Sequence, residues 1–161
     1  MTGPAAAGPE VAGPTAADSA RGPALARPPE RSRIWAQVRQ FHELFQLPVR
    51  DRATAAVGSG QVTLRLALIE EELAELRTAA RAEDLVGVAD ALADIVYVAY
   101  GTAHVYGIDL DAVLDEVHES NLTKLGSDGA PMYRADGKVI KGPRSRPPAV
   151  AAVLDRPAPL P

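Results

Sequence analysis

Acidic residues gather at two places in the sequence where their side chains could bind a metal ion together. Glu71, Glu72 and Glu75 form the first group, and Asp90 and Asp94 form the second, four residues apart. Spacings of three and four place side chains on one face of a helix. Crowded carboxylates repel one another, and a hard divalent cation with oxygen ligands, such as Mg²⁺, removes that penalty. The two groups therefore indicate a metal site shared by two consecutive helices.

Each acidic group also has a simpler interpretation. Runs such as EEELAEL occur on solvated helix faces, and the pair Asp90 and Asp94 is equally ambiguous when taken alone. The second group, however, lies within the otherwise apolar stretch ADALADIVYVAYG, which leaves little room for a solvated face around Asp94. From these residues alone, a metal site and a solvated surface are about equally supported.

Polar and basic residues further along the chain are candidates for binding phosphate. Asn121 falls where a helix periodicity would place an apolar residue, and Lys124 follows about one turn later. Arg134 and Lys138 lie in a segment that reads as a small hairpin. Such side chains donate charge-assisted hydrogen bonds to phosphate oxygens, although a solvated basic loop would have the same composition.

The periodicity of apolar residues predicts that helices position all of these groups. Four helices are expected, at residues 34–47, 62–82, 84–106 and 109–124. Pro48 should end the first, Gly107 should cap the end of the third, and Asp109 should begin the fourth. The expected inward-facing residues are Ile34, Val38, Phe41 and Phe45; Leu66, Ile69, Leu73 and Leu76; Leu85, Val88, Leu92, Ile95 and Ala99; and Val113, Leu114 and Val117.

Short connections between four helices predict an all-α fold, a four-helix antiparallel bundle with negligible strand content. A small hairpin or ordered loop is expected at residues 133–141, turning at Asp136-Gly137. Apolar stretches such as IVYVAY exceed what one small core needs, so the domain is expected to be oligomeric.

Composition divides the chain into three parts. Residues 1–30 repeat Gly-Pro and are predicted to be disordered, residues 31–143 form the folded domain, and residues 144–161 form a Pro-rich tail with at most a short helix at Ala149–Leu154. The net charge of −4 argues against a nucleic-acid polymer as partner. The absence of cysteine excludes disulfides and thiolate chemistry.

Several other classes of protein are excluded or disfavoured. No uninterrupted apolar run approaches the roughly 18 residues of a membrane helix, and the N-terminus lacks the features of a secretory signal, so a cytoplasmic protein is expected. His118 follows Asp115 by three residues, but a di-iron bundle needs a second such motif. His42 and His104 are expected at helix surfaces.

The pattern Glu71-Glu72-x-x-Glu75, followed by an acidic motif that ends at Asp94, resembles the MazG-like superfamily of all-α nucleoside triphosphate pyrophosphohydrolases. That superfamily also contains dimeric dUTPases and phosphoribosyl-ATP pyrophosphohydrolases. The resemblance covers about residues 34–143 and includes the stretches VRQFHELFQLPV, DALADIVYVAYGTAHVYGIDL, VHESNLTK and RADGKVIKGP.

The resemblance implies Mg²⁺-dependent hydrolysis of a nucleoside triphosphate to a monophosphate and pyrophosphate, with Mn²⁺ as a substitute ion. It implies Glu72, Glu75 and Asp94 as metal ligands, with Glu71 at the acidic position beside them. A carboxylate that is not committed to the metal can act as general base toward water, and Glu71 is the candidate for that role. It also implies that Asn121, Lys124, Arg134 and Lys138 contact the substrate. The family's Glu-x-x-Asp motif has its Glu at Ala91 here, so Asp90 is expected to take that role.

Within the enzyme class, the branch favours dUTP or a non-standard dNTP over phosphoribosyl-ATP, in a homodimer or homotetramer. Because the glutamate is missing at position 91, a second hypothesis remains, a non-catalytic oligomeric module that binds a nucleotide or a partner. The sequence leaves open the preferred nucleotide, the number of metal ions, the role of Asp90 and the choice between dimer and tetramer.

Overall fold

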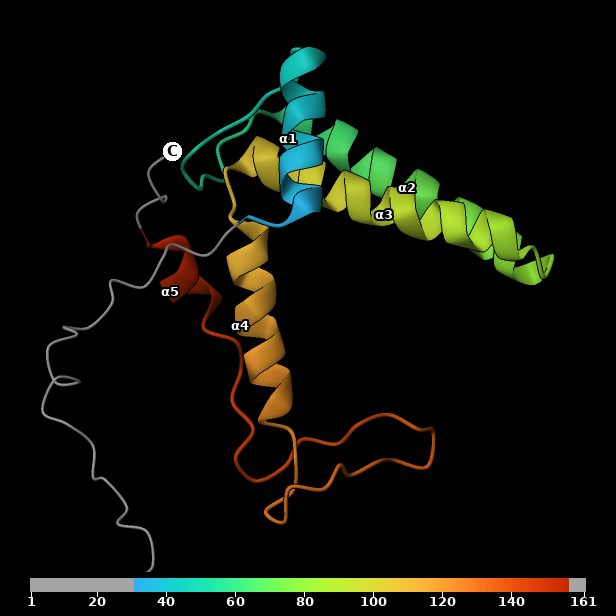
Figure 1. The fold of residues 1–161 in the computed structure, drawn as a ribbon, viewed down its shortest axis with the longest axis vertical. Coiled ribbons are helices and arrows are strands. Elements are labelled where there is room, and N and C mark those ends of the chain that lie inside the picture. The colour runs from blue at the N-terminus through green and yellow to red at the C-terminus, as the bar shows by residue number, and fades with distance from the viewer. Residues whose placement is uncertain (1–30, 157–161) are drawn as a thin grey trace, which may run out of the picture. The chain divides into compact units, whose positions relative to one another are not determined.

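In the computed structural model, which describes residues 31–156, the chain folds into α-helices joined by loops (Figure 1). The helices are α1 (Arg33–Leu44), α2 (Ser59–Arg81), α3 (Leu85–Tyr106), α4 (Leu110–Leu122) and α5 (Val150–Leu154). Within residues 31–156 there is no strand, and an isolated bridge between Tyr133 and Val139 closes the expected hairpin. The all-α class is confirmed, while the predicted disorder of residues 1–30 lies outside the described residues.

Capping residues define both ends of α3 and the start of α4, and two of them, Gly107 and Asp109, were predicted. The side chain of Asp84 accepts hydrogen bonds from the backbone N–H groups of Val86 and Gly87 at the start of α3. Gly107 ends α3 in the left-handed region, at φ 68°. Asp109 caps α4 by accepting from the N–H of Ala112, at 3.2 Å. These three residues satisfy backbone groups that a helix end leaves without partners.

Helix α1 ends earlier than predicted. The sequence suggested an end at Leu47, whereas the helix stops at Leu44. Gln46 adopts a left-handed conformation with φ 55°, and the N–H of Leu47 turns back to the carbonyl of His42 at 2.8 Å. This arrangement ends the helix as a left-handed C-terminal cap does. The sequence does not predict it, because Gln46 stands where such caps usually have glycine.

The antiparallel helices α2 and α3 meet in layers of facing residues, and these layers repeat every seven residues along each helix. A Cβ on Gly87 would lie 3.0 Å from the Cβ of Ala79, which fixes one layer. Moving seven residues back along α2 corresponds to moving seven residues forward along α3, and the next layers follow. The layers are Ala79 with Gly87, Glu72 with Asp94, and Arg65 with Gly101. A sustained repeat of seven is the spacing that keeps one seam of a helix facing its partner.

Helix α1 packs on α3 through a core that contains both histidines. His42 and His104 are buried, at 2% and 3% exposure, so the expectation of surface positions is wrong. His42 Nδ1 lies 3.0 Å from the carbonyl of Pro48, and His104 Nε2 lies 3.1 Å from the carbonyl of Trp35. Each ring therefore has a backbone partner that makes its burial tolerable. Burial lowers the pKa of both histidines, which favours the neutral imidazole.

The predicted apolar stripes of α2 and α3 are buried only in part. Leu66 and Leu92 are 57% and 49% exposed, and Leu85 is 79% exposed. The periodicity correctly predicts helices, but the prediction that these residues are buried is wrong for this single chain. The reason is geometric, since α2 and α3 cover only the seam between them and α1 covers only part of α3. A long apolar face of the helix pair is left open.

Helix α3 is long and apolar enough, by length and composition, to cross a membrane, a test that core helices also pass. It packs against α1 and α2 and carries two aspartates near its middle. Only 17% of its most apolar 18-residue window is buried, so these contacts cover a small part of its apolar surface.

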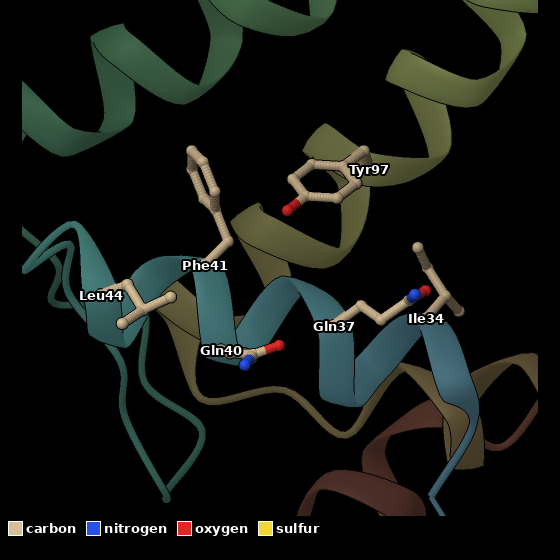
Figure 2. A pocket seen from close by; sticks show the side chains of 6 residues that line it. All are labelled: Ile34, Gln37, Gln40, Phe41, Leu44 and Tyr97. Atoms are coloured by element: carbon tan, nitrogen blue, oxygen red, sulfur yellow. The ribbon is translucent and has the colours of Figure 1, made fainter.

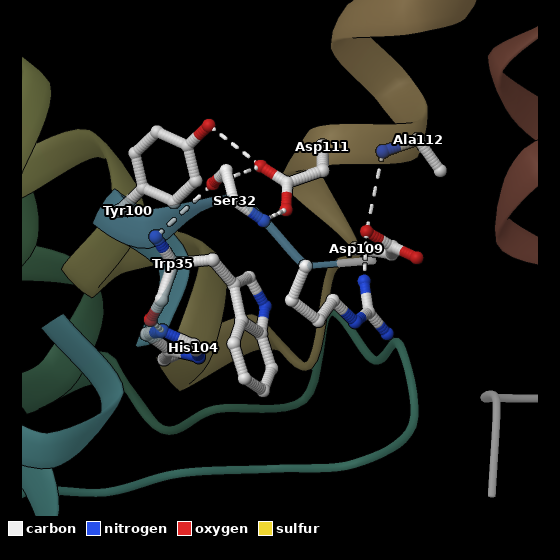
Figure 3. Close-up of polar contacts among 8 residues, drawn as sticks. Ser32, Trp35, Tyr100, His104, Asp109, Asp111 and Ala112 are labelled. Atoms are coloured by element: carbon white, nitrogen blue, oxygen red, sulfur yellow. Dashed lines mark hydrogen bonds and ion pairs between the residues drawn. The ribbon is translucent and has the colours of Figure 1, made fainter. Parts of the chain in front are cut away.

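A polar cluster ties the start of α1 to α3 and α4 (Figure 3). Asp111 accepts hydrogen bonds from the N–H and hydroxyl of Ser32, at 2.8 and 2.7 Å, and from the hydroxyl of Tyr100 at 2.8 Å. Arg31 forms an ion pair with Asp109 beside it. The hydrogen bonds from Ser32 and Tyr100 hold the pKa of Asp111 below its ordinary value even though burial opposes this.

The C-terminal segment is attached along α4. Arg146 forms an ion pair with Glu116, its N–H donates to Thr123 Oγ1 at 3.0 Å, and its carbonyl accepts from Ser120 at 2.8 Å. Helix α5 follows, at the position predicted for a short helix, and packs against α4 with Val153 buried. The main helical neighbour of α4 within the chain is therefore α5.

Candidate functional site

The carboxylate of Glu72 stands at the centre of the predicted acidic site. The side chain is half-buried in the seam between α2 and α3, and its Oε2 atom is buried with no hydrogen-bond partner in the described part of the chain. Partial burial raises the pKa of Glu72, and the charges of Asp94, Glu75, Glu71 and Asp90 raise it further, in that order. A buried carboxylate oxygen without a partner is costly unless something else compensates it.

The five acidic residues predicted from the sequence lie close together. Asp94 lies across the seam from Glu72 but is exposed, so the expectation of little room for a solvated face around it is wrong. Glu75 and Glu71 are also exposed, on α2. Asp90 is exposed one turn before Asp94 on α3. The two sequence groups therefore combine into one acidic surface, which we call the acidic face.

The acidic face fits a Mg²⁺ ion that is completed by other ligands. Within residues 31–156, no group of three histidine or acidic side chains is placed to hold an ion by itself. Mg²⁺ needs few protein carboxylates, since it commonly keeps several waters and shares its ligands with substrate phosphates. The unpartnered oxygen of Glu72, with carboxylates on both sides, is the kind of donor that such an ion would satisfy.

The structure explains the missing glutamate at position 91. Ala91 is 2% exposed and packs inside the fold, so a charged side chain there would be buried. Asp90, by contrast, is exposed and close enough to Glu72 to raise its pKa. Asp90 stays the candidate for the place of the expected glutamate.

The predicted phosphate-binding residues lie elsewhere in the chain. Lys124 Nζ donates to Asn121 Oδ1 at 2.6 Å at the end of α4, and Arg134 pairs with Asp136 at 2.9 Å in the following loop. Lys138 is exposed in the same loop. Figure 1 shows this end of α4 pointing away from the α2–α3 pair. Within one chain, the structure therefore does not bring these residues to the acidic face.

A cavity of about 370 Å³ lies between α1 and α3 (Figure 2), and one residue that lines it, Tyr97, follows Asp94 by three residues on α3. Phe41 and Tyr97 project into the space between the helices, and Gln37 and Gln40 line its wall on α1. Phe41 was expected in the core and is instead 37% exposed at this cavity. The sequence contained one indication of this cavity: Tyr97 follows Asp94 by three residues, so an aromatic ring lies about one helical turn from an acidic residue.

Arg65 is a second polar residue that the sequence analysis missed. It is 5% exposed, and its Nε atom is buried without a hydrogen-bond partner in the described residues. Burial lowers its pKa. The backbone of Gly101 makes room for it, because a Cβ there would lie 2.9 Å from His42 Nε2 and 3.3 Å from a guanidinium nitrogen of Arg65.

Comparison with known proteins identifies the family of the chain. Residues 38–121, more than half of the chain, match the phosphoribosyl-ATP pyrophosphohydrolase family. An uncharacterized protein of Acanthamoeba polyphaga mimivirus is 39% identical over 80 residues, which are 50% of this chain and 30% of the viral protein. The crystal structure of a candidate NTP pyrophosphohydrolase from Exiguobacterium sp. 255-15 is 27% identical and covers 74% of this chain and 90% of its own, with a TM-score of 0.40.

The matched residues 38–121 include all five residues of the acidic face. The chain belongs to the phosphoribosyl-ATP pyrophosphohydrolase family, within the MazG-like superfamily that the sequence resembles.

Proposed function

We propose that this protein uses Mg²⁺ to hydrolyse dUTP or a non-standard deoxynucleoside triphosphate to the monophosphate and pyrophosphate. The observation that carries the proposal is the half-buried carboxylate of Glu72, with one oxygen unpartnered and four carboxylates nearby. Such a cluster is unfavourable by itself and becomes favourable when a cation binds.

The carboxylates have two proposed tasks. Glu72, Glu75, Asp94 and Asp90 would hold the ion, whose chemistry is to neutralise phosphate charge and lower the pKa of water. Glu71 is exposed beside them and not buried in the seam, so its carboxylate is free to accept the proton of the attacking water. The hydroxyl of that water joins phosphorus as the α–β phosphoanhydride bond breaks, and the pyrophosphate carries away the electron pair.

The cavity between α1 and α3 is the proposed place for the nucleoside part of the substrate. It begins at Tyr97, one helical turn from Asp94, so a nucleotide with its phosphates at the acidic face would extend into it. The ring of Phe41 offers a stacking surface, and the amides of Gln37 and Gln40 offer both hydrogen-bond donors and acceptors to a base edge.

A second copy of the chain is the proposed source of the phosphate-binding residues. Asn121, Lys124, Arg134 and Lys138 lie far from the acidic face of their own chain, while the apolar face that includes Leu66 and Leu92 is open. A homodimer or homotetramer would cover this face and allow the end of one α4 to approach the acidic face of a neighbour.

The test is a pyrophosphate-release assay with a panel of deoxynucleoside triphosphates and Mg²⁺. Glu72→Gln should lower kcat/KM roughly 100-fold or more, because it removes several kcal/mol of charge stabilisation. Glu70→Gln is the matched control, since Glu70 lies on the same helix, is exposed, and is not among the charges that affect Glu72. EDTA should abolish activity, and Mn²⁺ should restore it.

The alternative is a helical module that binds nucleotides or a partner without cleaving them. The family to which the chain belongs consists of hydrolases, which favours catalysis. Absence of pyrophosphate release from every nucleotide in the panel, by a protein that still binds them, would support the module instead.

A further inference from the structure

We infer that the hydroxyl of Tyr97 binds a hydroxyl of the nucleotide's sugar and sets the enzyme's preference among pentoses. This inference rests on the proposed function, because it names the residue that recognises the middle of the same substrate.

Tyr97 has a fixed ring and a free hydroxyl. The ring is half-buried and packs edge-on against Phe41, with centroids 5.7 Å apart and an interplanar angle of 81°. Its hydroxyl makes no hydrogen bond within residues 31–156. Tyr100, one turn later on α3, differs in this respect, because its hydroxyl donates to Asp111 at 2.8 Å. Of these two neighbouring tyrosines, one is engaged in holding the fold and the other is available to a ligand.

The free hydroxyl lies between the two ends of the proposed site. Tyr97 follows Asp94 by three residues, about 4.5 Å along the helix axis and on the same side of α3. Figure 2 shows its oxygen directed toward α1, into the cavity that Phe41 and the two glutamines line. Toward Asp94 lies the acidic face, where phosphates would bind, and toward α1 lies the wall suited to a base.

The sugar is the part of a nucleotide that joins phosphates to base, so it is the part that should meet Tyr97. A phenol can both donate to and accept from a sugar hydroxyl. A site built around such a contact discriminates strongly against an analogue that lacks the hydroxyl, since the protein's polar group is then left unpaired.

The experiment uses the full-length chain with Tyr97→Phe, and Tyr106→Phe as the matched control at the far end of the same helix. Three triphosphates with one base are compared, the ribonucleotide, the 2′-deoxynucleotide and the 2′,3′-dideoxynucleotide. For the substrate that carries the contacted hydroxyl, Tyr97→Phe should lower kcat/KM about tenfold, which corresponds to one lost hydrogen bond of about 1.4 kcal/mol. For the analogue without that hydroxyl, wild type and variant should be equal.

Binding provides a second readout that is independent of turnover. The dissociation constants of the corresponding non-hydrolysable α,β-methylene triphosphates should show the same pattern by calorimetry. If the contact is to the 3′-hydroxyl, Tyr97→Phe should weaken binding of the ribonucleotide and the deoxynucleotide and leave binding of the dideoxynucleotide unchanged. If the contact is to the 2′-hydroxyl, Tyr97→Phe should weaken binding of the ribonucleotide alone.

Two results would overturn the inference. An equal loss on all three nucleotides would show that Tyr97 only supports packing, and no loss on any of them would show that its hydroxyl is not used. If the wild type hydrolyses none of the three, the proposed function fails, and the binding constants of the methylene analogues still decide the role of Tyr97.

Discussion

Glu72 and Arg65 lie seven residues apart on the same face of α2, and each has a buried polar atom that finds no partner among residues 31–156. Opposite charges in one seam would ordinarily pair, but about 10.5 Å of helix separates these two residues. Glu72 and Arg65 therefore do not pair with each other, and each charge must interact with other groups. For Glu72, the surrounding carboxylates point to a cation. For Arg65, the neighbours are His42 and the bare backbone at Gly101.

Gly101 allows Arg65 and His42 to occupy the space beside α3. Gly101→Ala should destabilise the protein by about 1–3 kcal/mol, because the new methyl group would press on two side chains that have no room to move. The measurement is the urea midpoint of unfolding.

Gly60→Ala is the matched control for that variant. Gly60 lies in α2, and in residues 31–156 no atom beyond its chain neighbours and the backbone of its own helix lies within 4 Å of the added Cβ, so the change should stabilise by roughly 0.5–1 kcal/mol through helix propensity. Equal effects of the two substitutions would contradict the packing described around Gly101.

The sequence predicted the acidic residues of the site but not the residues around them. Asp94 is recognisable because a carboxylate in an apolar stretch is unusual, and Glu72 because its acidic run resembles a family motif. Gln37, Tyr97 and Arg65 have no such mark, since an amide, a ring or a cation on a helix is common. Their roles depend on which helix packs across them, and that is a property of the crossing of α1 over α3.

At the scale of helices, two of the residues at helix ends were predictable. Gly107 and Asp109 act locally, so three or four residues of sequence contain the information. The end of α1 was not predictable in this way, because Gln46 adopts a left-handed conformation that its residue type disfavours. Burial of the apolar stripes also failed as a prediction, because periodicity shows that a face is apolar without showing what covers it.

The interface between α1 and α3 should weaken in mild acid. The pKa values of His42 and His104 are lowered in the folded state by burial, so the unfolded chain binds more protons as the pH falls below about 6.5. Their contribution to stability is therefore complete above that pH and is lost below it. The melting temperature at pH 5.5 should be several degrees lower than at pH 7.5.

A variant identifies the residue responsible. His104→Gln keeps a side-chain donor for the carbonyl of Trp35 and cannot titrate, so it should reduce the difference between the two pH values. His118→Gln is the control, since His118 is exposed on α4. Asp111 and Glu116 have lowered pKa values and lose their contributions only below about pH 4, outside the tested range. An unchanged pH dependence in His104→Gln would refute the assignment.

At the scale of the whole molecule, the acidic face and the basic end of α4 are the two halves of one proposed site on different subunits. Glu72→Gln and Lys124→Ala should each be inactive as pure proteins. In an equal mixture allowed to exchange subunits, half of the dimers would combine both variants and contain one intact site. Activity should return to roughly a quarter of wild type, as expected for a symmetric dimer.

A second mixture serves as the control for complementation. Glu72→Gln and Asp94→Asn damage the same acidic face, so their mixed dimers should contain no intact site and should remain inactive. If both mixtures stay inactive while the subunits exchange, the residues at the end of α4 do not complete the site in a neighbouring subunit.

The seven-residue repeat of the α2–α3 seam has a further consequence. Sliding one helix past the other by a single repeat would place Arg65 opposite Asp94, an alternative pairing that neutralises both charges. The turn between the helices prevents this slip, because Glu83 adopts a left-handed conformation at φ 55° and Asp84 caps α3 immediately afterwards. The fold is thus locally frustrated, because the turn holds apart two opposite charges that could otherwise pair. A short turn keeps the aspartate away from its internal counter-ion, and the acidic surface keeps its charge for a partner from solution.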